Sequence, residues 1–194
     1  MKMAKKFLAV ALAGVLALSV LTGCGKSVKS KDIADALTKM GVKVEQSDEM
    51  DKTAEDTLKA IEAIINSETN TGADKVTLDN AVKVDGKVIE INNIVNDPNN
   101  AVKKALGMMS TGSPAETENN AKQVRVALVK TENAKKDASL QAALVKDGLI
   151  ATHVLILSTD KEIAETGKLG SAKTSDGKYI LVVIVNDVVK KSGT

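Results

Sequence analysis

The chain has 194 residues, enough for one domain with a real core or for two small ones. It contains one tyrosine, one phenylalanine and no tryptophan, which disfavours sites that hold sugars, nucleobases or quaternary amines on aromatic faces. With a single cysteine and a single histidine, it lacks the several His or Cys ligands of the usual zinc sites.

The N-terminus has the layout of a secretory signal. Lys2, Lys5 and Lys6 form a positive segment, and an apolar run of 14 residues follows from Phe7 to Val20. This run is shorter than the roughly 20 residues of a membrane-spanning helix, but it fits the apolar region of a signal peptide. No other apolar run in the sequence is long enough to span a membrane.

The four residues that end this segment, Leu21-Thr22-Gly23-Cys24, resemble the lipobox of bacterial lipoproteins. The resemblance covers only residues 1–24. It implies that the signal peptide, residues 1–23, is cleaved before Cys24. It also implies a diacylglycerol thioether on the Cys24 sulfur, usually with fatty acylation, such as palmitate, of the new amino group.

Two or three acyl chains would give a stable membrane anchor. The mature protein is then expected on the outer face of the bacterial cell membrane, or on the outer membrane if the host has two. Residues 24–30 would form the lipidated cysteine and a short tether.

Removal of residues 1–23 reverses the sign of the net charge. The whole chain carries +2, but the mature part keeps 24 basic against 25 acidic side chains. Its lone arginine is Arg125. Without a basic excess or an arginine cluster, nucleic-acid binding is not expected.

The first stretch of the mature chain, 31–109, alternates helical and extended patterns. Ser30 is expected to cap a helix that ends at Gly41, and a short strand follows. Ser47 or Asp48 then begins a longer helix, because apolar residues recur there at steps of three and four. This apolar stripe consists of Met50, Ala54, Leu58, Ile61 and Ile65.

The rest of this stretch predicts a hairpin and a helix. Val76, Leu78, Val82 and Val84 share one parity, as in a strand with one buried face. The Asp85-Gly86 pair suits a tight turn into a returning strand. A helix is expected after Pro98, and residues 110–120 are expected to form a linker.

The second stretch, 121–194, predicts further strands and helices in chain order. A strand over 123–131 is followed by a helix from about 133 to 146 and by a central strand over 149–158. A capping-box pattern at 159–162 predicts a short helix. The turn 175–178 then leads into a strand that is buried on both faces.

These patterns predict an α+β fold in which amphipathic helices pack on mainly antiparallel strands. Two segments, "VDGKVIEINNIVND" and "SDGKYILVVIVND", share a turn and an ending, so the stretches 31–109 and 121–194 could be similar helix–strand–helix–hairpin halves. Shared turn chemistry explains the likeness equally well, and the two stretches could belong to one domain.

The sequence offers few candidates for chemistry. The only histidine, His153, lies in the apolar run "ATHVLIL", so we expect a structural role in a strand rather than a catalytic base. Oxygen-bearing residues cluster near Asp97 and near Asp187, but helix capping and turns explain them without calcium. The calcium candidates considered were Asn96, Asp97, Asn99, Asn100, Asn186 and Asp187.

One further resemblance concerns the C-terminal end. The segment "LGSAKTSDGKYILVVIV" is similar to the terminal hairpin of CAP (cysteine-rich secretory protein-like) domains. It covers about 17 residues, and the His- and Glu-bearing motifs of that family are not visible in this sequence.

We therefore expect a lipid-anchored extracytoplasmic protein that binds a protein, peptide or envelope partner and is not an enzyme. The alternatives are a small-ligand (solute) binding lipoprotein, a cell-envelope hydrolase and a CAP-like domain. Cys24 is the one expected modification site. No catalytic residue, cofactor or metal ligand is assigned.

Overall fold

A computed structural model describes residues 28–68, 71, 77–81, 101–106, 122–151 and 159–191. Several features expected from the sequence lie outside these ranges. They are Cys24 with the residues before it, the hairpin around Asp85-Gly86, the linker 110–120 and His153.

The described residues form helices and strands in a mixed order. The elements are α2 (Ser30–Lys39), β1 (Val44–Gln46), α3 (Asp48–Ile65), α4 (Leu78–Ala81), α6 (Ala101–Ala105), β2 (Lys122–Lys130), the 3-10 helix η2 (Glu132–Ala134), α7 (Ala138–Gly148), β3 (Ile150–Ala151), β4 (Lys161–Ile163), β5 (Gly167–Lys173) and β6 (Tyr179–Lys190).

One sheet joins all the described strands, in the order β1-β5-β6-β2-β3. The long strand β6 lies at its centre, antiparallel to β2 and β5, and the short strand β4 pairs with the distal end of β6. Only β1 and β5 run parallel. The expected α+β fold with mainly antiparallel strands is confirmed.

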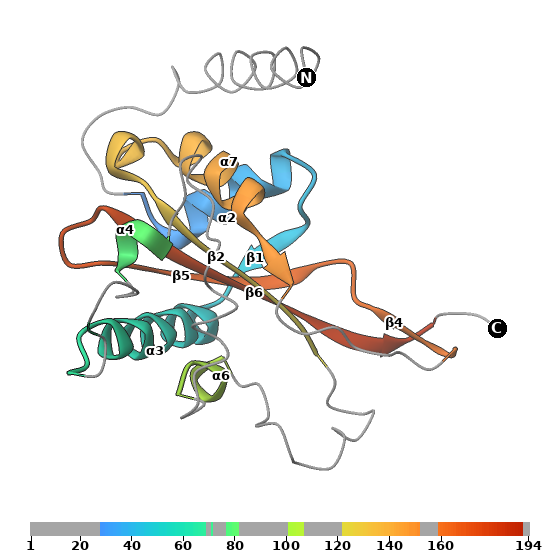
Figure 1. Cartoon of the computed structure of the whole chain (residues 1–194). Helices are drawn as coiled ribbons and strands as arrows, with labels where there is room; N and C mark the ends of the chain where they lie inside the picture. The colour runs from blue at the N-terminus through green and yellow to red at the C-terminus, as the bar shows by residue number, and fades with distance from the viewer. Residues whose placement is uncertain are drawn as a thin grey trace, which may run out of the picture.

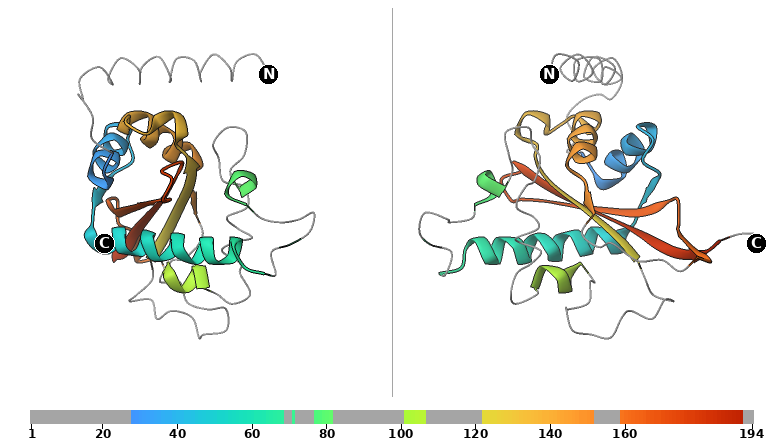
Figure 2. Two further views of the ribbon diagram at one scale, coloured as in Figure 1. Left: turned by 90° about the vertical axis from the view of Figure 1, so that its left-hand side faces the viewer. Right: turned by 45° about the vertical axis from the view of Figure 1, so that its right-hand side comes forward.

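Helices cover both faces of this sheet (Figures 1 and 2). Helices α3 and α6 pack on one face, where they meet the odd-numbered residues of β6 from Tyr179 to Val185. Helices α2 and α7 pack on the other face, against Ile180, Val182 and Ile184. Because successive side chains of a strand point to opposite faces, β6 is buried on both sides, as its sequence predicted.

Helix α3 follows the sequence prediction closely. It begins after Ser47, carries three acidic residues in its first turn, and buries Met50, Ala54, Leu58 and Ile61 against the sheet. Acidic side chains near a helix N-terminus are favourable because they face the positive end of the helix dipole. The predicted apolar stripe is therefore confirmed.

A glycine permits the close packing of α3 on β5. A Cβ atom at Gly170 would lie 1.9 Å from the carbonyl carbon of Met50 and 2.2 Å from the amide nitrogen of Asp51. Only a residue without a side chain fits there. The start of α3 therefore touches the backbone of β5.

Four local predictions are wrong. Residues Leu78–Ala81 form helix α4 where a strand was expected, and Lys161–Ile163 form strand β4 where a short helix was expected. Pairing with the end of β6 outweighs the local capping pattern in β4. The predicted helix over 133–146 is divided into η2 and α7. Of the strand predicted over 149–158, the structure describes β3, which lies beside β2 at the edge of the described sheet rather than at its centre, and residues 152–158 lie outside the described ranges.

The stretches 31–109 and 121–194 contribute to the same sheet. Strand β1 from the first stretch pairs with β5 from the second, and α2 packs against α7 and β5. The helix that a duplication would require at 159–162 is absent from the described residues, because β4 occupies that place.

Candidate functional site

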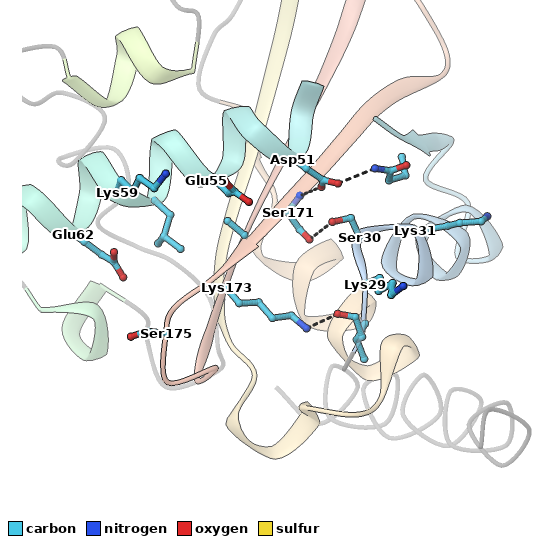
Figure 3. Close-up of a pocket in the computed structure, with 14 residues that line it drawn as sticks. Lys29, Ser30, Lys31, Asp51, Glu55, Lys59, Glu62, Ser171, Lys173 and Ser175 are labelled. Atoms are coloured by element: carbon cyan, nitrogen blue, oxygen red, sulfur yellow. Dashed lines mark hydrogen bonds between the residues drawn. The ribbon is translucent and has the colours of Figure 1, made fainter. Parts of the chain in front are cut away.

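A groove of about 800 Å³ lies between α3, the end of β5 and the residues that lead into α2 (Figure 3). Most of the side chains that line it are charged or polar, and its apolar lining consists of Val28, Leu58 and Ala172. Parts of the chain more than a hundred residues apart therefore meet at this surface.

One wall of the groove is a stripe of charged side chains on α3. Asp51, Glu55, Lys59 and Glu62 recur at steps of four, four and three, which places them on one side of the helix. This stripe runs beside the buried apolar stripe of α3. The same helix thus supplies core residues to the sheet and carboxylates to the groove.

The opposite wall is basic. Lys29 and Lys31 come from the entry to α2, and Lys173 comes from the end of β5. The Lys173 Nζ donates a hydrogen bond of 2.5 Å to the carbonyl oxygen of Val28. Partial burial lowers the pKa of Lys173 from its ordinary value, while nearby Asp32 acts in the opposite direction.

A hydrogen-bonded network joins the two walls. The backbone N–H of Ser171 donates to the Asp51 Oδ1 at 2.9 Å, and the Gln46 Nε2 donates to the Asp51 Oδ2 at 2.8 Å. The hydroxyls of Ser30 and Ser171 share a hydrogen bond of 2.7 Å. Ser30 was expected to cap α2, but the helix begins at Ser30 and its side chain faces the groove instead.

Some charges of the groove are available for a ligand. The carboxylates of Glu55 and Glu62 and the ammonium group of Lys29 form no ion pair with another described residue. By contrast, Asp51 and Lys173 are engaged in the network above. The groove therefore contains two groups of charges: those engaged in the network, which fix its shape, and those that form no ion pair with a described residue.

The groove also lies close in sequence to the expected anchor. Val28 is four residues after Cys24, so their Cα atoms are at most about 14 Å apart. Val28 is buried, and its carbonyl is held by Lys173. The point at which the chain joins the domain is thus fixed against the groove.

A second polar cluster surrounds the only tyrosine. The Tyr179 hydroxyl donates a hydrogen bond to Asp79, and the Lys130 Nζ lies 2.9 Å from the Asp79 Oδ1. The hydrogen bond from Tyr179 is the main cause that lowers the pKa of Asp79. Burial, together with Asp79, raises the pKa of Tyr179 to about 12. This cluster attaches α4 to the sheet.

Arg125 and Asn186 form a third polar contact. The Arg125 Nη2 donates to the Asn186 Oδ1 at 2.9 Å, and the Asn186 Nδ2 donates to the carbonyl oxygen of Ala164. Burial lowers the pKa of Arg125. Asn186, one of the calcium candidates, therefore supports the strands around it.

The other candidate residues are less informative. Asp187 is exposed on β6, while Asn96, Asp97, Asn99 and Asn100 lie outside the described residues. Within the described ranges, no group of three or more His, Cys, Asp or Glu side chains is placed to hold a metal ion. In the same part of the chain, no helix is long and apolar enough to cross a membrane.

Sequence reasoning singled out Cys24 and did not identify the groove. A signal was present in the spacing of Asp51, Glu55, Lys59 and Glu62 beside the apolar stripe. Such a stripe is usual on a solvated helix face, so it does not by itself indicate a site. The opposing lysines are distant in sequence and could not be placed without the tertiary structure.

Comparisons with known proteins gave no match. No protein-family model, no curated protein and no solved structure matches this chain.

Proposed function

We propose that this chain is a lipid-anchored, extracytoplasmic binding protein without enzymatic activity. In this proposal Cys24 carries the lipid, and the groove beside α3 holds the partner. The domain would stand on the outer face of the bacterial cell membrane, or on the outer membrane of a host with two membranes.

The observation that carries the binding proposal is the groove with its charges that form no ion pair with a described residue. Glu55 and Glu62 on one wall and Lys29 on the other are available to a partner, whereas Asp51 and Lys173 maintain the walls. Exposed charges on opposed walls favour specific recognition of a polar partner.

An enzymatic role has less support. Among the described residues, the groove lining includes no histidine or cysteine, and its one carboxylate with a fixed geometry, Asp51, already accepts hydrogen bonds from Ser171 and Gln46. Tyr179 is likewise bonded to Asp79. A hydrolase would have to use the remaining carboxylates, serines and lysines.

A small solute is the second candidate partner. The groove volume of about 800 Å³ lies within the usual range of roughly 300–1,000 Å³ for small-molecule sites. However, such sites are mostly apolar and aromatic, whereas this lining is mainly charged and polar. A partner with several polar groups fits better than a compact apolar solute.

The anchor is tested by Cys24→Ser in the full chain, followed by cell fractionation. We expect the variant to accumulate unprocessed or to leave the membrane fraction, because it has no sulfur to carry the lipid. Ser27→Ala, in the same tether, is the control and should remain processed and membrane-bound. Unchanged processing and membrane retention of Cys24→Ser would refute the anchor.

Binding is tested by a thermal-shift screen of the processed chain against metals, sugars, amino acids and peptidoglycan fragments. A bound ligand raises the unfolding temperature according to its concentration relative to its Kd. A saturable shift that Glu55→Gln or Lys29→Gln reduces would support the groove as the site. A saturable shift that both variants leave intact would place binding elsewhere.

A further inference from the structure

We propose that the ligand of the groove is a short, extended peptide that presents both an ammonium group and a carboxylate. This inference rests on the proposed binding function and names the class of ligand. It is drawn from the length of the groove and from the placement of its free charges.

The length of the α3 wall matches a peptide. From Asp51 to Glu62 the helix α3 rises by about 16 Å, because an α-helix rises 1.5 Å per residue. An extended peptide covers at most about 3.3–3.6 Å per residue, so about five residues fit along this wall. A single amino acid would occupy only a small part of it.

The α3 wall carries the carboxylates of Glu55 and Glu62 with Lys59 between them, whereas the charged residues of the opposite wall are lysines. In Figure 3, Glu55 and Glu62 project from α3, while Lys29 and Lys173 come from the opposite side. A ligand ammonium would interact with the carboxylates, and a ligand carboxylate would interact with the free ammonium of Lys29. A ligand with only one of these charges would leave the other wall unpaired.

Other ligands with two charges suit the groove less well. The apolar residues that the described part of the chain contributes to the lining are Val28, Leu58 and Ala172, which offer little surface for the acyl chains of a phospholipid. The lone arginine, Arg125, is not part of the lining, although arginine is the preferred partner of phosphate groups. No aromatic ring from the described part of the chain lines the groove to hold a nucleobase.

The test uses four forms of penta-alanine with the full chain as the cell processes it. The forms have both termini free, the N-terminus acetylated, the C-terminus amidated, or both termini blocked. Isothermal titration calorimetry gives their Kd values. We expect the form with both charges to bind most tightly, and the loss of either charge to weaken binding by about fivefold to tenfold.

Variants assign each charge to a wall. Glu55→Gln combined with Glu62→Gln should weaken the peptides that have a free N-terminus and leave the acetylated peptides unchanged. Lys29→Gln should weaken the peptides that have a free carboxylate and leave the amidated ones unchanged. Glu49→Gln and Lys52→Gln, on α3 outside the groove, are the matched controls and should bind every form like the parent.

Two results would overturn the inference. One is equal affinity for all four peptides, including the case in which none binds. The other is a charge preference that the groove variants leave unchanged. Saturable binding to phosphatidylethanolamine vesicles while no peptide binds would be one form of the first result. In each case, membrane release of Cys24→Ser would still support the anchored protein, so the two proposals fail separately.

Discussion

The close contact between α3 and β5 makes Gly170→Ala a severe test of the structure. The added Cβ would lie 1.9 Å from the Met50 carbonyl carbon and 2.1 Å from the Met50 oxygen, where ordinary contacts are about 3.5–4.0 Å. All three nearest atoms belong to the backbone, so no side-chain rotation can relieve the overlap. Helix α3 must therefore move away by about 1.5 Å or more.

This movement has two costs. Overpacking of a core usually destabilises a protein by about 1–3 kcal/mol. It would also stretch the hydrogen bond of 2.9 Å from the Ser171 N–H to Asp51, and a bond to a charged group contributes about 1.5–3 kcal/mol. We expect Gly170→Ala to lower the free energy of unfolding by about 3 kcal/mol or more, a large part of the usual 5–15 kcal/mol.

Urea unfolding followed by circular dichroism measures this loss. For a slope of about 1–3 kcal/mol per molar urea, the midpoint should fall by about 1 M or more. Lys168→Ala, on an exposed position of the same strand, is the control and should stay within about 0.5 kcal/mol of the parent. If Gly170→Ala is as stable as this control, α3 does not pack on β5 as described.

Two further predictions concern the other polar contacts. Tyr179 is the only tyrosine in the sequence, so phenolate absorbance reports on it alone. The titration of Tyr179 should have a midpoint near pH 12, and Asp79→Asn should move that midpoint down toward pH 10. Because the pKa of Tyr179 is raised in the folded state, its stabilising contribution should be complete below about pH 10 and be lost as the pH rises to about 12. If Asp79→Asn leaves the titration midpoint of Tyr179 unshifted, the contact with Asp79 is contradicted. Lys173→Met keeps the apolar stem but removes the donor to Val28, so amide hydrogen exchange at residues 28–31 should become faster than in a Lys168→Met control, with a loss of about 1 kcal/mol in global stability. Equal exchange in both variants would show that Lys173 does not hold the entry to α2.

Where the sequence pattern is strongly periodic, it predicted the structure. The apolar stripe of α3 and the two-sided apolar run of β6 each specify a face, because the periods 3.6 and 2 correspond to different backbone geometries. Gly41 and Gly177 likewise occur with φ of 86° and 65°, at the helix end and the turn where their sequence positions predicted them.

Where the pattern was short, long-range contacts decided the outcome. The segment Lys161–Ile163 has a local helix signal, but it pairs with Val188–Lys190 and becomes a strand. The segment Leu78–Ala81 was expected to be part of a strand, but it forms α4, where Asp79 accepts a hydrogen bond from Tyr179, one hundred residues further along the chain. A few residues carry too little local preference to resist such contacts.

By itself, the sequence determined the α+β class, the two faces of α3 and β6, and the expectation of an anchor at Cys24, because each depends on neighbouring residues in the chain. Only the tertiary structure brought Lys29 and Lys173 opposite the carboxylates of α3. The physical reason is that the groove depends on the pairing of β5 with β1 and β6 and on the close approach at Gly170. The pairing of β1 with β5 and the contact at Gly170 join residues more than a hundred positions apart, and no local pattern records them.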